Sequence, residues 1–455
     1  MSKKVIIIGG GIAGLSAAHE LAERNQNDEF EIHIYEAHPD IPGGKARSLP
    51  VPDSGREGRF DLPAEHGFRI FLGCYHHLDD TMKRIPYGRG STFDNLVDTT
   101  RLLIGRFDTP TFVTIAKYPR SFRDFRQVWE AVFDLDESGL TLDDVEFFSR
   151  KLWQFATSCQ ERRLAEYEKM TWWRFIEADT RSLAYQNLLG NGISRSVTAN
   201  NPHIGNAKTM GDICLQIFFS VINPTVPATR VLNGPTNEVW LDPWKTYLEA
   251  LGVTYTFNAT VESIQYAEER IQSVGINVGD GESLKVSGDY FIFALPVEVM
   301  GKLLTNMGPQ SSNPMLHADA SLSGIIELQR DVAWMNGLFF FLTEDVPVTH
   351  GHQLYTESPW AVTGISQLQF WGGAGFDISY YGDGQVKGIL STIISNWDTP
   401  GLLHKKPAKA CTPQEIKEEV WEQMKRCLNI EGQAPILTDD LLHSWFLAPS
   451  IQPNT

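Results

Sequence analysis

Three glycines near the start of the chain are spaced so that the backbone can approach a phosphate group. Gly9, Gly11 and Gly14 follow an apolar run, and apolar residues recur at helical spacing after them, so we expect a strand, a tight turn and a helix. Gly9 suits the turn, Gly11 lets a pyrophosphate come close, and Gly14 lets the helix pack on the strand. The first helical amides, at Ile12 and Ala13, would then bind the phosphates.

An acidic residue and two cations follow where a dinucleotide needs them. The run FEIHIYEA predicts a second strand that ends at Glu36 and Ala37, about 20 residues after the glycine turn, where a carboxylate accepts hydrogen bonds from a ribose. The pair Gly43–Gly44 permits a second close backbone approach, and Lys45 and Arg47 add positive charge for the same pyrophosphate. Together these residues predict a dinucleotide site.

Two short segments carry a family resemblance. The run GGKARS resembles the motif of the amine oxidase and phytoene desaturase superfamily of flavoproteins, which implies FAD rather than NAD. The run EHGFRIFLGCY resembles a segment of plant-type carotene desaturases and of hydroxysqualene dehydroxylase-like flavoproteins. The resemblance places Gly67, Phe68, Arg69 and Tyr75 near the flavin ring or the pyrophosphate, and makes His66 and Arg69 the candidates for catalytic positions.

A second matching block lies in the middle of the chain. It begins at RVLNGPTNEVW and includes a helix with Trp240 and Trp244, which we expect in the core, and Gly252 at the helix end. By the resemblance this block returns the chain to the FAD-binding domain, and Val261 offers its backbone to adenine. The run DYFIFALP then resembles the strand that ends at the cofactor.

The fold class expected is α/β, with a Rossmann-like FAD-binding domain interleaved with an α+β substrate domain that has a mixed sheet as its floor and helices as its lid. We expect five segments: residues 1–80 and 225–300 in the FAD-binding domain, an aromatic-rich, helical 81–224 and a strand-forming 301–410 in the substrate domain, and 411–455 returning toward the FAD-binding domain. The superfamily adds a closing C-terminal segment, so 411–455 is expected to be truncated.

The charge balance bears on the partner. The formal net charge of −17 argues against nucleic acid, although residues 83–126 are locally basic, as a solvated face or as a surface for anionic lipid. The five cysteines have no metal-ligand spacing and suggest neither zinc nor disulfides. With no signal peptide or membrane-spanning run recognised, we expect a cytoplasmic protein whose contact with a membrane is at most peripheral.

Three functions remain open at this level. The first is a desaturase, dehydrogenase or isomerase that transfers hydride from an isoprenoid-like or acyl substrate, held in an apolar pocket, to flavin N5, with oxygen or a quinone as electron acceptor. The second is an amine or amino-acid oxidase on the same fold. The third is a non-catalytic lipid or prenyl carrier that has lost its flavin.

Overall fold

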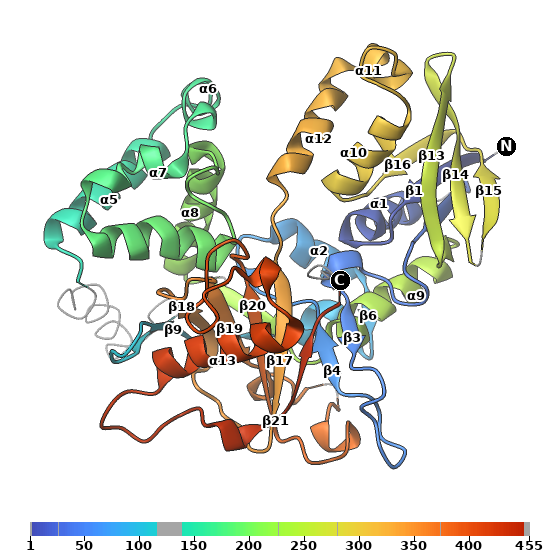
Figure 1. The fold of residues 1–455 in the computed structure, drawn as a ribbon. Helices are drawn as coiled ribbons and strands as arrows, with labels where there is room; N and C mark the ends of the chain where they lie inside the picture. The colour runs from blue at the N-terminus through green and yellow to red at the C-terminus, as the bar shows by residue number, and fades with distance from the viewer. Residues whose placement is uncertain are drawn as a thin grey trace. The chain divides into compact units, whose positions relative to one another are not determined.

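The computed structural model describes residues 2–25, 27–115, 139–225, 227–279, 281–373 and 375–449 (Figure 1). The chain forms two compact units, each built from three separate segments of the sequence. The first unit comprises 1–48, 77–95 and 234–333, and the second comprises 49–76, 96–233 and 334–455. The predicted fold class, a Rossmann-like domain interleaved with an α+β domain, is confirmed.

A four-stranded parallel sheet forms the centre of the first unit, in the order β12-β2-β1-β16. Its strands are β1 (Lys3–Ile8), β2 (Phe30–Tyr35), β12 (Thr254–Thr256) and β16 (Tyr290–Phe293). The β1 residues 5–8 are apolar and buried because β1 has a neighbour on each side. Helix α1 (Ile12–Glu23) follows β1 and buries Leu15, Ala18 and Ala22.

Helix α9 (Asp242–Ala250), preceded by the π-helical turn η6 (Asn237–Leu241), also packs on α1. Trp240 and Trp244 are buried, as predicted, and the Trp244 indole donates a hydrogen bond to His19 Nδ1 at 3.0 Å. Gly252 follows the helix with φ +89°, a conformation that favours glycine.

The remaining elements of the first unit form a second layer and short connections. They are the antiparallel strands β13 (Ala259–Ala267), β14 (Arg270–Val278) and β15 (Glu282–Val286), the helices α2 (His76–Arg84), α10 (Val297–Asn306), α11 (Pro314–Ala318) and α12 (Ser323–Leu328), and the two-residue strands β6 (Pro86–Tyr87) and β7 (Gly90–Ser91). Residues 297–333 thus lie with the first unit, because α10 and α11 pack on β13.

A seven-stranded mixed sheet forms the centre of the second unit, in the order β10-β9-β18-β19-β20-β17-β21. Its strands are β9 (Arg101–Gly105), β10 (Phe112–Ile115), β17 (Asn336–Leu342), β18 (Gly351–Tyr355), β19 (Val362–Ser366), β20 (Gly388–Ile394) and β21 (Leu442–Leu447). Helix α13 (Pro413–Leu428) covers one face, where Trp421 packs on Phe340. The strands expected within 301–410 are therefore present.

A separate helical core in the second unit surrounds Phe155, Tyr167 and Trp172. Its helices are α5 (Leu142–Ala156), α6 (Gln160–Ala165), α7 (Trp172–Phe175), the π-helix η5 (Tyr185–Val197) and α8 (Ala207–Ile222). Short strands complete the unit, namely β3 (Ser48–Pro50), β4 (Pro63–Glu65), β5 (Phe71–Leu72), β8 (Leu96–Asp98) and β11 (Thr229–Leu232).

Several segments differ from the sequence-based expectation. Residues 81–95 and 301–333 lie with the first unit and residues 225–233 with the second. Residues 86–115 form short strands rather than helices, because β9 pairs in parallel with the distant β18 and β8 pairs with β11. Residues 49–76 lie with the second unit. The described part of 411–455 also lies there, because α13 covers the seven-stranded sheet and β21 pairs with β17 at its edge.

Candidate functional site

The glycine turn between β1 and α1 is sterically required at both ends. Gly9 has φ +102°, and a Cβ there would lie 2.4 Å from the Ala294 carbonyl oxygen. A Cβ on Gly14 would lie 1.9 Å from the Gly9 carbonyl oxygen. Both positions therefore accept only glycine, for the reasons the sequence predicted: a left-handed turn and close helix packing.

Gly11 differs from its two neighbours in the motif. Its φ of −76° suits any residue, and a Cβ would meet its nearest atom, Gly44 Cα, at 3.7 Å. The packing of the protein does not require glycine here. A Cβ at Gly11 would lie in ordinary van der Waals contact with the Gly43–Gly44 loop. Gly11 is the N-cap of α1, none of the described side chains caps the helix, and its first turn holds no acidic residue. The N–H groups of that turn are of the kind that bind a diphosphate, and a glycine at the N-cap lets it come close.

A second glycine loop lies against this turn. The Gly43 amide donates to the Gly10 carbonyl at 3.0 Å, and Gly43 forms an isolated β-bridge with Gly11. Gly43 has φ +106°, and a Cβ there would lie 2.3 Å from Leu241 Cδ1. The Gly9–Gly14 and Gly43–Gly44 motifs thus lie side by side, as they must if both approach the same pyrophosphate.

Glu36 fastens the end of β2 to the first loop. Its Oε2 accepts the Gly10 amide at 2.7 Å and its Oε1 accepts the His38 amide at 2.8 Å. The side chain is buried, and each carboxylate oxygen keeps a further lone pair for a ligand hydroxyl. Ala37 beside it is exposed.

The two glycine loops and Glu36 form a cradle, and two further residues of it, Tyr255 and Gly10, were not predicted from the sequence. Tyr255, on β12, donates from its hydroxyl to the Gly10 carbonyl at 3.0 Å, and a Cβ on Gly10 would lie 1.8 Å from that hydroxyl oxygen. Burial, and next the charge of Glu36, raise the pKa of Tyr255, so the phenol stays protonated and remains a donor. The run of three consecutive glycines was the available signal for Gly10.

The two predicted cations lie at the second loop. The Arg47 Nη1 donates to the Gly44 carbonyl at 3.1 Å, and burial lowers the pKa of Arg47 while Glu36 opposes that shift. Lys45 is exposed and pairs with Glu298, Nζ to Oε1 3.1 Å. Both cations therefore belong to the first unit, together with the glycine loops and Glu36.

Val261 lies on β13, opposite Ile276, and the pairing register shifts between Val261 and Ser263. A shift of this kind leaves backbone groups out of the ladder. The irregularity is compatible with the predicted role of Val261, a backbone contact to adenine, which stays a prediction.

The predicted ring-side segment belongs to the second unit. A Cβ on Gly67 would lie 2.9 Å from Ile393 Cδ1, and the His66 carbonyl oxygen would lie 2.5 Å from a Cβ on Gly337, so the segment packs tightly on β17 and β20. Arg69 Nη1 donates to the Gly67 carbonyl. Burial lowers the pKa of Arg69, and Glu65 opposes that shift.

The other two predicted residues of that segment differ in exposure. Tyr75 is 40% exposed. Phe68 packs against His352 of β18, with ring centroids 5.4 Å apart. His352 was not found from sequence: it is buried, its Nε2 has no hydrogen-bond partner among the described residues, and burial lowers its pKa to about 4.

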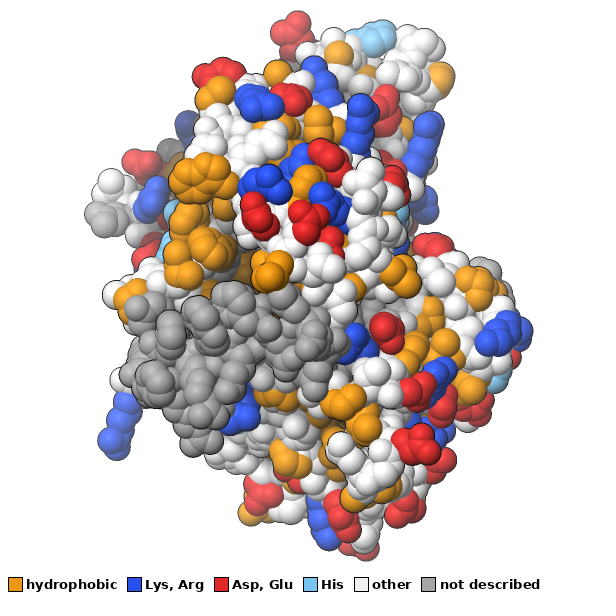
Figure 2. Space-filling model, turned by 90° about the vertical axis from the view of Figure 1, so that its left-hand side faces the viewer, with side chains coloured by type: hydrophobic (Ala, Val, Ile, Leu, Met, Phe, Trp, Pro, Cys, Tyr) orange, Lys and Arg blue, Asp and Glu red, His pale blue; other side chains and the backbone are white. Residues whose placement is uncertain are grey.

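The basic segment at 83–126 is only partly described. Lys117, Arg120, Arg123 and Arg126 lie outside the described residues. Arg84 forms ion pairs with Glu20, Glu23 and Asp80. Figure 2 shows the side that carries α5–α8. Hydrophobic side chains gather there, and the charged side chains around them are a mixture of acidic and basic ones. Contact with a lipid surface stays a prediction.

Neither a cluster of three potential metal ligands nor a helix both long and apolar enough to cross a bilayer occurs among the described residues. The five cysteines are free.

The part of the chain that contains the two glycine loops and Glu36 is similar to known dinucleotide-binding proteins. Residues 7–85 match the family described as NAD(P)-binding Rossmann-like domain. A carotenoid phi-ring synthase from Chlorobaculum tepidum is 41% identical over 78 residues, which cover 17% of this chain and 11% of that protein. A zeta-carotene desaturase from Zea mays is 39% identical over 82 residues, 18% of this chain and 12% of that protein. The match thus spans about a tenth of either relative.

Solved structures are similar over nearly the whole chain. An oxidoreductase from Methanosarcina mazei has a TM-score of 0.60 at 13% identity, covering 98% of this chain and 87% of that chain. A putative protoporphyrinogen oxidase from Exiguobacterium sp. 255-15 gives 0.57 at 15%, covering 98% and 86%. Putrescine oxidase with bound putrescine gives 0.60 at 13%, covering 98% and 84%.

The fold is that of the oxidoreductase structures to which the chain is similar, and residues 7–85 are similar to a dinucleotide-binding domain. The resemblance to the amine oxidase and phytoene desaturase superfamily, predicted from GGKARS and EHGFRIFLGCY, is confirmed by the carotenoid-related sequences, over about a fifth of this chain.

Proposed function

We propose that this chain binds FAD and oxidises a lipophilic, isoprenoid-like or acyl substrate, as a desaturase, dehydrogenase or redox-assisted isomerase. The observation that carries the proposal is Gly11, a glycine that the packing does not require, in the same unit as the cations Lys45 and Arg47 and the buried carboxylate of Glu36. The carotenoid-related names of the sequence relatives support a lipophilic substrate.

The residues of the first unit would hold the cofactor in distinct ways. The amides of Ile12 and Ala13 and the cations Lys45 and Arg47 bind the diphosphate, and Glu36 accepts from the adenosine ribose. Val261 contacts adenine through its backbone. FAD, when bound, supplies a two-electron acceptor for hydride at N5.

The second unit would supply orientation, exclusion of water and proton handling. The resemblance assigns Gly67, Phe68, Arg69 and Tyr75 to the cofactor and His66 to the ring side. On this proposal His352, adjacent to Phe68 and neutral because burial lowers its pKa, would offer Nε2 as the acceptor of a substrate proton. Oxygen or a quinone would serve as the electron acceptor.

The first test is the visible spectrum of the purified chain before and after denaturation. We expect a two-banded flavin spectrum, with FAD released on unfolding. Anaerobic addition of a lipophilic polyene or terpenoid should then bleach the oxidised flavin bands, and amines should not.

Two results would contradict the proposal. Bleaching by amines alone would identify an amine or amino-acid oxidase, the reaction named for putrescine oxidase. A colourless chain that takes up no added FAD would favour the carrier. Reoxidation of the bleached sample in air with formation of peroxide would show that oxygen can be the acceptor, and anaerobic reoxidation by an added quinone, with formation of quinol, would show that a quinone can.

A further inference from the structure

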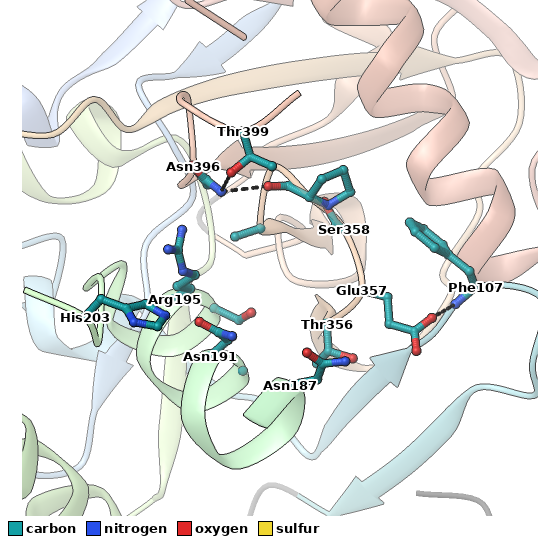
Figure 3. A pocket seen from close by; sticks show the side chains of 14 residues that line it. Phe107, Asn187, Asn191, Arg195, His203, Thr356, Glu357, Ser358, Asn396 and Thr399 are labelled. Atoms are coloured by element: carbon teal, nitrogen blue, oxygen red, sulfur yellow. Dashed lines mark hydrogen bonds between the residues drawn. The ribbon is translucent and has the colours of Figure 1, made fainter. Parts of the chain in front are cut away.

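A polar pocket in the second unit is separate from the residues assigned to FAD. It has a volume of about 500 Å³ and lies among the π-helix η5, the segment after β18 and the segment after β20 (Figure 3). An isoprenoid chain would require an apolar lining, whereas here most of the lining side chains are polar, among them three carboxamides and one arginine. The pocket therefore suits a ligand of a different chemistry.

The π-helix brings three of these polar side chains to one wall. Asn187, Asn191 and Arg195 are spaced four residues apart on η5 and all line the pocket. π-Helical geometry is rare and occurs frequently at functional sites. Asn396, from the segment after β20, lies on the wall above them in Figure 3 and already donates to Thr399 Oγ1 and to the Pro359 carbonyl.

Arg195 is the cation of the pocket, and most of its hydrogen-bonding capacity is unused. The described residues give its guanidinium one hydrogen bond, from Nη2 to Asn201 Oδ1 at 3.2 Å, and no ion pair. A guanidinium carries five N–H donors in a planar fork that matches a carboxylate or a phosphate. Partial burial lowers the pKa of Arg195 and the charge of Asp398 opposes that shift. The ordinary pKa of a guanidinium is so high that Arg195 stays charged.

His203 lies beside Arg195 and is held in place by an aromatic contact. Its ring lies 4.1 Å from the ring of Trp173, centroid to centroid, at an interplanar angle of 31°. The indole of Trp173 in turn donates to Asp179 at 2.7 Å. The imidazole edge can therefore present a second nitrogen to a ligand at the Arg195 wall.

The one carboxylate lining the pocket lies away from this wall. Glu357 is on the opposite side in Figure 3, and its Oε2 accepts the Phe107 amide at 2.9 Å. Arg195, Asn191 and His203 thus lie on the side away from Glu357, and Asp398, which is not part of the lining, acts electrostatically on Arg195. We propose that Arg195, with Asn191 and His203, forms a binding site for the anionic oxygen group of a small molecule, a carboxylate or a phosphate, distinct from the dinucleotide site.

The test titrates the purified full chain with inorganic phosphate and, separately, with acetate and succinate, at constant ionic strength, by calorimetry and by thermal shift. We expect saturable binding of at least one anion. Binding of phosphate alone assigns a phosphate ligand, and binding of a carboxylate alone assigns an acid. If none of the three anions binds at millimolar concentration, the proposal is overturned.

Two variants locate the site. Arg195→Gln removes the charged fork and should weaken binding about tenfold or more, whereas Arg150→Gln, at an exposed arginine of α5, should leave it unchanged. Asn191→Asp keeps the size of the side chain and places a carboxylate in the pocket, so it should abolish anion binding while the melting temperature without ligand stays near that of wild type. Equal losses in Arg195→Gln and Arg150→Gln would show a nonspecific charge effect and overturn the site.

Discussion

The carboxylate of Glu36 accepts the amide of Gly10, 2.7 Å from Oε2 to the nitrogen. The contact joins the end of β2 to the glycine turn after β1, so the residue assigned to a ribose also fixes the loop assigned to the diphosphate. Its other oxygen binds the amide of His38. Glu36 is therefore part of the protein's own framework as well as of the predicted cofactor site.

Replacing this carboxylate should affect stability and binding together. In Glu36→Gln only one oxygen remains as acceptor, so either the Gly10 or the His38 amide loses its partner. Leaving a buried N–H unpaired costs about 1–3 kcal/mol, and we expect a loss of that size in urea unfolding together with weaker FAD binding. Glu31→Gln, at an exposed position of the same strand, is the matched control and should change neither; an unchanged Glu36→Gln would refute the framework role.

The two first glycines of the motif should separate folding from binding. In Gly9→Ala a residue with a side chain must adopt a left-handed conformation, which costs about 1–3 kcal/mol. Its Cβ also collides with the Ala294 carbonyl, so the variant should have a lower melting temperature. Gly11→Ser has room for its Cβ and places a preferred N-cap residue at α1, so it should melt at or above wild type.

The same Gly11→Ser variant should nevertheless lose affinity for FAD, because the hydroxymethyl group occupies the space assigned to the diphosphate. We expect an increase in Kd of about tenfold, equivalent to ~1.4 kcal/mol, measured by flavin fluorescence. Gly324→Ala, a helical glycine of the same unit with nothing within 4 Å of the added Cβ, is the control. Wild-type affinity in Gly11→Ser would remove the main support for the cofactor assignment.

Tyr255 should act as a positioning residue for the glycine turn. Tyr255→Phe keeps the ring and removes only the hydrogen bond to the Gly10 carbonyl, a change worth about 1 kcal/mol. We expect a small drop in stability and a measurable drop in FAD affinity. Tyr290→Phe removes a hydroxyl that contacts only exposed Lys3 and should show neither; equal behaviour of the two variants would speak against positioning.

Local patterns predicted the cradle because its geometry is local. The strand, the glycine turn and α1 are adjacent in sequence, and the requirement for glycine at positions 9 and 14 follows from backbone sterics that spacing reveals. The strands β17 to β20 could be predicted for the same reason, from short apolar runs.

Contacts between distant segments could not be predicted in this way. The five residues of β9 form a strand because they pair with β18, which lies some 250 positions later in the sequence. No local sequence pattern predicts that pairing. Tyr255 reaches Gly10, and His352 reaches Phe68, across similar separations. Apart from Gly10, the site residues that were missed lie on strands brought in from distant parts of the sequence.

His352 should make folding stability depend on pH. Burial lowers its pKa to about 4 in the folded chain, against about 6.5 when unfolded. Between these values the unfolded chain binds a proton that the folded chain does not, so stability falls as the pH falls from 6.5 to 4 and does not fall further from this group below 4. The full contribution is about 3 kcal/mol.

Removing the imidazole should therefore flatten the acid side of the stability profile. His352→Phe keeps a ring against Phe68 and removes the imidazole that the unfolded chain protonates and the folded chain does not. From pH 7 to pH 4 the free energy of unfolding of the wild type should therefore fall by about 3 kcal/mol more than that of the variant. Urea unfolding at several pH values measures it, with His77→Gln at an exposed position of α2 as control. If His352 also accepts the substrate proton, the same variant should lose substrate-dependent bleaching of the flavin even at pH 7, where its fold is intact. A variant with a wild-type pH profile would show that the imidazole is hydrated in solution, and a variant with full bleaching would show that the proton goes elsewhere.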